Sequence, residues 1–170
     1  KAVAHTLRTY SKYTIPYPYP VAISVEAENG MEYPMISFNP GRAEEDGTYT
    51  QAAKEAAIGV IIHEVGHNYF PMIINSDERQ WTWMDEGINS FLEAQAEYLW
   101  EDEFPAGSQA APNVLDSITS YMTSENQVPI MTNSESLVQF GPNAYSKPTA
   151  ALTVLRETVM GRELFDFAFK

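Results

Sequence analysis

The stretch from Ile61 to Phe91, IIHEVGHNYFPMIINSDERQWTWMDEGINSF, decides how the rest of this chain is interpreted. It contains two of the chain's three histidines, His63 and His67, four residues apart. In a helix this spacing places both imidazoles on one face, one turn apart, so both can bind a single ion. Neutral imidazoles suit zinc, and a catalytic zinc site takes three protein ligands and leaves a position for water. Glu64, beside the first histidine, is placed to act as a general base on that water.

Glu86 is the best candidate for the third ligand, because it lies in WMDEG (residues 83–87) at the expected start of a second helix. Ser90 and Glu93 follow Glu86 by four and seven positions on the same helix face. Either can accept a hydrogen bond from a ligand histidine and orient its ring. Glu93 can equally be an ordinary polar position, and this interpretation is favoured for Ser90, a shorter and weaker acceptor. Asp85 can serve only to cap the helix. An HExxH sequence alone is also compatible with a solvated helix turn that binds no metal.

These motifs resemble those of the gluzincin metallopeptidases, and more narrowly those of the M1 family of zinc aminopeptidases. That family has HExxH, eighteen intervening residues and then Glu, which is the interval between His67 and Glu86 here. It also carries a Gly-x-Met-Glu-Asn segment upstream and a tyrosine well downstream of the glutamate ligand. This chain has NGMEYP at residues 29–34 and Tyr145 in the corresponding places. The first and last residues of the upstream segment differ from the family pattern, which leaves substrate preference open.

The resemblance implies a role for each matching residue. Glu32 would bind the free amino group of a substrate, with Gly30 and Met31 in the same substrate-binding segment. Tyr145 would donate its hydroxyl to the oxyanion of the reaction. From the residues alone, Glu32 can also be a solvated carboxylate on an edge strand, and Tyr145 a packing residue with one polar tip.

The pattern of apolar residues and turn signals predicts an α+β fold, in which a few strands precede a mainly helical part. Strands are expected over 21–27 and 34–39, and Pro34, which cannot donate to a ladder, places the second at a sheet edge. Helices are expected over 1–13, from Thr48 or Thr50 to about 68, over 85–101, from Pro112 to 121 and over 145–160. The second helix is apolar almost all round and is expected to be buried centrally. The resemblance implies a thermolysin-like zincin catalytic domain, with a small mixed sheet whose edge strand lines the cleft.

Composition bounds the class of protein. The 170 residues suffice for one domain with a core, and the initial Lys suggests a piece of a longer polypeptide. The resemblance implies the same, because M1 enzymes are much longer than this chain. The flanking domains of the parent polypeptide are then expected as partners of this segment. The formal net charge of −13 argues against nucleic acid and anionic membranes, because both need clustered Lys and Arg. The longest apolar stretches are too short for a membrane span, and the acidic surface either solvates the chain or helps recruit a cationic substrate terminus.

The hypothesis is a zinc-dependent aminopeptidase with one Zn2+ ion, acting on peptide substrates with a free amino terminus. Two enzyme alternatives stay open from the sequence, a gluzincin endopeptidase and an M61-type peptidase. A third alternative is an M1-like binding module that keeps the fold without turnover, which the intact HExxH, Glu86 and Tyr145 argue against. Without flanking domains, the isolated segment is expected to have little activity of its own.

Overall fold

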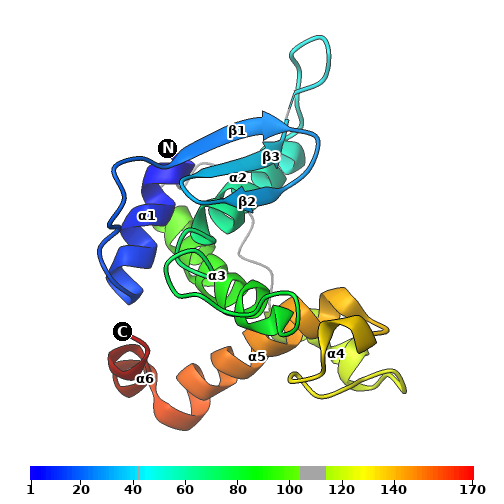
Figure 1. The fold of residues 1–170 in the computed structure, drawn as a ribbon. Helices are drawn as coiled ribbons and strands as arrows, with labels where there is room; N and C mark the ends of the chain where they lie inside the picture. The colour runs from blue at the N-terminus through cyan, green and yellow to red at the C-terminus, as the bar shows by residue number, and fades with distance from the viewer. Residues whose placement is uncertain (42, 104–113) are drawn as a thin grey trace.

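The computed structural model describes residues 1–41, 43–103 and 114–170. Figure 1 shows the small sheet lying over α2, α3 in the middle, and the C-terminal helices leading away from the sheet. In chain order the described elements are α1 (Ala2–Tyr13), β1 (Ile23–Ala27), β2 (Met31–Tyr33), β3 (Ile36–Pro40), α2 (Gln51–Gly66), η1 (Thr82–Met84), α3 (Glu86–Glu103), α4 (Val114–Met122), η2 (Ser134–Ser136), η3 (Pro142–Ser146), α5 (Lys147–Val154), η4 (Leu155–Met160) and α6 (Arg162–Phe169). This combination of a small sheet and a mainly helical part confirms the α+β prediction. Within these ranges, no helix has both the length and the apolar content to cross a bilayer.

The described sheet is mixed, with the strand order β1-β3-β2. β1 pairs parallel with β3, and β2 pairs antiparallel with β3, with Glu32 opposite Ser37. The expectation of an edge strand over 34–39 is wrong, because β3 begins at Ile36 and lies in the middle. Pro34 falls in the turn before it, together with Met35, whose φ of 66° suits a tight turn. The edge strand next to β3 is instead β2, which carries Glu32 in a segment expected to form a turn.

Helix α2 begins where the sequence indicated, since Thr50 accepts a hydrogen bond from the Ala53 amide at 3.1 Å and caps the helix. It packs against β3, α1 and α3. Ile62 and Val65 near its end are fully buried, whereas Ala52 in its first turn is exposed. The prediction of a centrally buried helix therefore holds for the end that carries the two histidines and is wrong for the first turn.

The main core lies where α1, α2 and α3 meet. The helices predicted over 1–13 and 85–101 are confirmed as α1 and α3. The buried apolar side chains of this core are Tyr10, Ile62, Tyr69, Phe70, Phe91, Leu92, Ala96 and Phe165. They come from four helices and from the segment that follows α2, so packing between residues distant in sequence sets how α2 and α3 face one another.

The last long helix, predicted over 145–160, begins three residues earlier and is not uniformly α-helical. π-helical turns at Pro142–Ser146 and Leu155–Met160 flank α5 (Lys147–Val154). Gly161, with a φ of 81°, ends the helix as expected. The helix predicted to end near 121 is confirmed as α4, while Pro112, its expected first residue, lies outside the described residues.

Candidate metal centre

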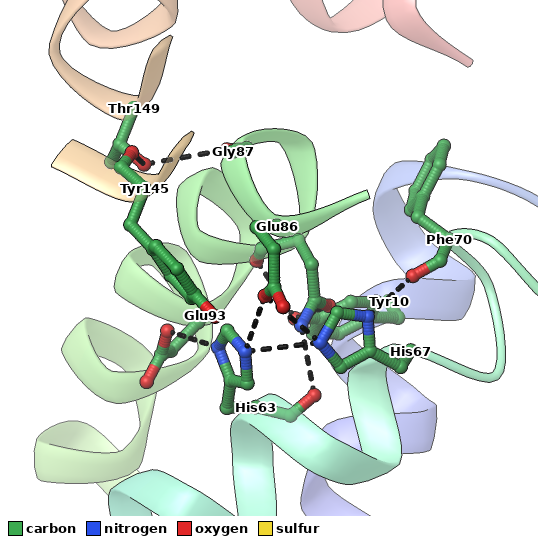
Figure 2. A network of polar contacts seen from close by, with 10 residues as sticks. Tyr10, His63, His67, Phe70, Glu86, Gly87, Glu93, Tyr145 and Thr149 are labelled. Carbon is green, nitrogen blue, oxygen red and sulfur yellow. Dashed lines mark hydrogen bonds and ion pairs between the residues drawn. The ribbon is translucent and has the colours of Figure 1, made fainter. Parts of the chain in front are cut away.

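The end of α2 and the start of α3 bring three metal-ligating side chains to one point (Figure 2). His63 Nε2 lies 3.0 Å from His67 Nε2. Glu86 Oε2 lies 3.0 Å from His63 Nε2 and 3.2 Å from His67 Nε2. Helical geometry supplies the pairing of the two imidazoles, whereas the approach of Glu86 depends on the packing of α3 against α2. The structure thus brings together the three residues that the sequence nominated as ligands.

The other nitrogen of each imidazole has its own partner. His63 Nδ1 donates to Glu93 Oε2 at 2.8 Å, and His67 Nδ1 donates to the Phe70 carbonyl at 2.7 Å. These bonds direct the two Nε2 atoms toward one another and increase the basicity of both rings. Glu93 therefore contacts His63 as an orienting acceptor would. Ser90, in contrast, is half-buried, and among the described residues it is not a hydrogen-bond partner of either imidazole.

The arrangement fits a divalent metal ion. Ligand atoms of a tetrahedral zinc ion lie roughly 3.3 Å apart, close to the 3.0–3.2 Å found among His63, His67 and Glu86. Two imidazole lone pairs and a carboxylate this close repel one another unless a proton or a cation lies between them. Burial opposes a positive charge on either ring. The hydrogen bonds and negative charge of Glu86, joined at His63 by those of Glu93, outweigh it, so the pKa of both histidines is raised. Burial also opposes ionisation of Glu86, but hydrogen bonds with both histidines lower its pKa. The charges therefore favour a cation here.

Glu64 lies on α2 between the two histidines and is only 8% exposed. Its Oε2 atom has no hydrogen-bond partner in the part of the chain that the structure describes. Burial raises the pKa of Glu64 to about 7, against the opposing charge of the two histidines. Gly30, just before β2, lies so close that a Cβ there would overlap Glu64 Oε1. A buried carboxylate whose pKa is near neutrality has the properties that a general base needs.

A second group of acidic side chains lies beside His67. One ligand atom each of Glu32, His67 and Asp85 lies within 4.8 Å of the other two. Glu32 is on the edge strand β2, next to Met31, whose side chain is exposed. Asp85 is 3% exposed, its Oδ1 atom has no partner among the described residues, and burial raises its pKa to about 7. Asp85 is therefore a buried carboxyl that is partly protonated at neutral pH, and it lies beside the ligands in addition to any capping role.

Tyr145 reaches the ligands from η3, the π-helical turn before α5 (Figure 2). Its ring stacks on that of His63 with 5.8 Å between the ring centroids. Burial raises the pKa of the Tyr145 hydroxyl, and the charge of Glu86 and a hydrogen bond with it add to the effect. The hydroxyl therefore stays protonated at neutral pH and can donate a hydrogen bond.

A glycine on α3 lets the helix that carries Tyr145 come this close. A Cβ on Gly87 would lie 2.6 Å from Pro148 Cβ and 2.9 Å from the Ala144 carbonyl oxygen. Thr149 Oγ1 lies 2.7 Å from the Tyr145 carbonyl and 3.3 Å from the Gly87 carbonyl, so it links the two helices. Close packing of η3 and α5 on the start of α3 thus places the tyrosine over the ligands.

Three further residues near the ligands were missed in the sequence. Asn89 donates to the His63 carbonyl at 2.9 Å, and Tyr10 donates to Asn89 Oδ1 at 2.8 Å. Burial raises the pKa of Glu78, and the negative charge of Glu32 raises it further, so Glu78 belongs to the same acidic region. The position of Asn89 one turn after the glutamate ligand was a usable signal, but nothing local indicated the other two.

Comparison with solved structures places this geometry in a known fold. Two crystal structures of an M1 zinc metallopeptidase from Deinococcus radiodurans resemble the chain, one of them determined on a mutant. The mutant structure has a TM-score of 0.68 and 20% sequence identity, and the other has 0.64 and 22%. Each covers 99% of this chain, which in turn covers 35% and 34% of theirs and so spans about a third of their length. At these identities the likeness concerns the fold.

Comparison of the sequence with family profiles gives the stronger result. No curated protein matches the sequence significantly. The Peptidase family M1 domain, however, matches residues 2–170. Because that match leaves out only the first residue, and the fold agrees over nearly the same range, this chain belongs to peptidase family M1.

Proposed function

We propose that this chain is the catalytic part of a zinc-dependent aminopeptidase, which removes the amino-terminal residue from peptides. The observation that carries the proposal is the position of Glu32, whose carboxylate lies within 4.8 Å of a ring nitrogen of the ligand His67. A carboxylate so close to the metal ligands can hold the ammonium group of a substrate one residue from the bond to be cleaved. An endopeptidase does not need an anion at that place, because its substrate has no ammonium group there.

The proposed ligands of one zinc ion are His63, His67 and Glu86, which match the three protein ligands of a catalytic zinc site. When bound there, zinc would polarise the scissile carbonyl and lower the pKa of a water molecule. Glu64 is the proposed general base, which takes a proton from the water and passes it to the leaving amine. Its burial and its pKa of about 7 support this role.

Tyr145 is the proposed donor to the substrate's carbonyl oxygen as negative charge develops on it. Its ring stacks on that of His63, so Tyr145 lies on the side of α2 that carries the proposed zinc ligands. Its raised pKa keeps the proton available for donation. A single donor in such a place contributes about 3 kcal/mol to transition-state stabilisation.

The edge strand β2 is the proposed docking place for the substrate backbone. An extended peptide can add itself as a further strand along a sheet edge of this kind. Glu32 lies on that strand and would hold the ammonium group, with the carboxyl of the buried Asp85 nearby. Gly30 and Met31 precede Glu32 in the same segment, and the missing side chain of Gly30 lets the segment approach Glu64.

The test is metal analysis combined with hydrolysis of aminoacyl fluorogenic amides by the full polypeptide that carries this chain. We expect one zinc ion per chain and cleavage of amides with a free amino group but not of their acetylated counterparts. Equal cleavage of acetylated substrates would identify an endopeptidase, and zinc binding without cleavage would identify a binding module. A protein that binds no divalent metal would refute the proposal.

Replacement of Glu32 provides a sharper measurement. Glu32→Gln removes the charge that would pair with the ammonium group and should raise KM by about 10- to 100-fold, with a smaller effect on kcat. Glu28→Gln is the matched control, because Glu28 is an exposed carboxylate in the connection before the same strand. Steady-state kinetics on free-amine substrates compare the two variants. An equal rise in KM for both would indicate a general effect of charge and no ammonium contact at Glu32.

A further inference from the structure

Asn89 of α3 links Tyr10 of α1 to the backbone of α2 at the candidate metal centre. Figure 2 shows Tyr10 close to His67. Both side chains are 0% exposed. Tyr10 Oη donates to Asn89 Oδ1 at 2.8 Å, and Asn89 Nδ2 donates to the His63 carbonyl at 2.9 Å. Hydrogen bonds therefore run from α1 through α3 to the residue of α2 that provides the first imidazole.

Asn89 adds a second hydrogen bond to a carbonyl that already has one. The His63 carbonyl accepts the helical bond from the His67 amide at 3.2 Å and the bond from Asn89 at 2.9 Å. The His63 carbonyl can only accept, so Asn89 Nδ2 faces it, and Asn89 Oδ1 is left to accept from the Tyr10 hydroxyl. The pair therefore acts as one unit on the backbone between the two histidines.

Gly66 makes this close approach possible. A Cβ there would overlap Tyr10 Oη and Asn89 Oδ1 and would lie 2.5 Å from Tyr10 Cζ. Gly66 belongs to the helical turn that joins His63 to His67, so the two buried side chains press directly on the backbone that sets the spacing of the imidazoles. The proposed chemistry uses none of Tyr10, Asn89 and Gly66.

We infer that Asn89, held by a hydrogen bond from Tyr10, is a positioning residue for the metal ligands. It joins α3 to α2 one turn after Glu86 and at the carbonyl of His63, so it fixes the separation between the carboxylate ligand and the imidazoles. Partners that hold ligands in place before an ion binds increase metal affinity, because less order has to be created on binding. The inference rests on the metal site of the proposed function.

The test measures metal affinity and ligand geometry in the full polypeptide. Competition with a chromophoric chelator gives the Zn2+ affinity, and the visible spectrum of bound Co2+ reports the ligand geometry. Asn89→Leu keeps the approximate size of the side chain and removes its hydrogen bonds, and Tyr10→Phe removes one hydroxyl. Tyr69→Phe is the matched control: Tyr69 is also 0% exposed, its ring lies 5.4 Å from that of Tyr10, and its hydroxyl pairs with Ser11 at 2.8 Å.

Asn89→Leu should weaken Zn2+ binding on the order of 10- to 100-fold and alter the Co2+ spectrum. Tyr10→Phe should weaken binding by about 3- to 10-fold, as expected for one hydrogen bond. Tyr69→Phe should leave affinity and spectrum unchanged even where it lowers Tm by as much as Tyr10→Phe does. Unchanged affinity and spectrum in Tyr10→Phe would overturn the inference even if Asn89→Leu fails to fold, and so would an equal loss in Tyr69→Phe. A wild-type protein that binds no Zn2+ would instead refute the proposed function.

Discussion

Burial gives Glu64 the pKa that its proposed role as general base needs. Desolvation raises its pKa to about 7, and the positive charge of His63 and His67 acts in the opposite direction. A base whose pKa lies near the working pH can both accept and release a proton. The charge of a bound metal ion would act in the same direction as the histidines, so Glu64 would be ionised at neutral pH and able to accept a proton.

Glu64→Gln should retain zinc and lower kcat by about 10²- to 10⁴-fold, because Gln has nearly the same shape and cannot accept the proton. Metal analysis and turnover of a fluorogenic amide measure the two quantities on the same preparation. A loss of zinc in proportion to the loss of activity would count against Glu64 as the base, since it would place the defect in the metal site.

Tyr145→Phe should lower kcat by roughly 100-fold with little change in KM, because in the proposed role the hydroxyl contacts charge that develops only in the transition state. Tyr121→Phe serves as the control. Tyr121 is 3% exposed, and its hydroxyl accepts from the Val128 amide at 3.2 Å, away from the ligands. Steady-state kinetics separate kcat from KM for both variants, and an unchanged kcat in Tyr145→Phe would remove the residue from the mechanism.

Helices were easier to predict than the sheet, for a physical reason. The start of α2 at its Thr50 cap and the end of the long C-terminal helix at Gly161 depend on local hydrogen bonds and on backbone conformation. The central place of β3 depends on its parallel pairing with β1, a contact that no local pattern contains. Pro34 does stay out of the hydrogen-bonded ladder, as expected of a proline. The strand begins only after it, so Pro34 does not place that strand at the edge.

The π-helical turn that carries Tyr145 was also beyond the reach of sequence patterns. Its position follows from contact between Gly87 on α3 and Pro148 on α5, residues that helical spacing alone does not relate. Gly87→Ala should therefore push the two helices apart, displace Tyr145 and lower kcat by about 10- to 100-fold.

Gly141→Ala is the control for this change, because a Cβ at Gly141 meets nothing within 4 Å and its φ of −53° suits any residue. Kinetics and thermal unfolding are compared for both variants. If Gly87→Ala keeps the wild-type kcat, close packing at Gly87 has no part in placing the tyrosine.

Across the whole molecule, the cluster of His63, His67 and Glu86 could be predicted from the sequence, and part of the structure that supports it could not. The proximity of the His63 and His67 rings follows from helical periodicity. The contact of Glu93 with His63 follows from the position of Glu93 on the same helix face as Glu86. Tyr10, in contrast, is 79 residues away from Asn89, and their contact depends on how three helices pack. Such contacts leave no trace in the local pattern of one sequence.

Stability of the whole protein should depend on metal and pH together. The pKa of His63 and of His67 is raised above the ordinary 6.5, so their protonated forms stabilise the metal-free protein below that pH and lose this effect as pH rises through the raised values. Zinc needs neutral imidazoles, so its affinity should change in the opposite direction, by up to about 100-fold per pH unit for two protons.

The measurement is the difference in Tm between zinc-loaded and chelator-treated protein. This difference should be small near pH 5 and should increase toward pH 8, because tighter binding to the folded state raises Tm by mass action. A difference that does not vary with pH would contradict the assignment of both histidines as ligands.

The overlap that any side chain at Gly66 would create with Tyr10 and Asn89 has an evolutionary consequence. A methyl group introduced there by mutation would be tolerated only alongside a smaller residue in α1 or α3. Among descendants of a common ancestor, the three positions should therefore mutate in concert, and an alignment of family members should show alanine in the signature motif only in lineages that have already lost the bulky tyrosine or the amide.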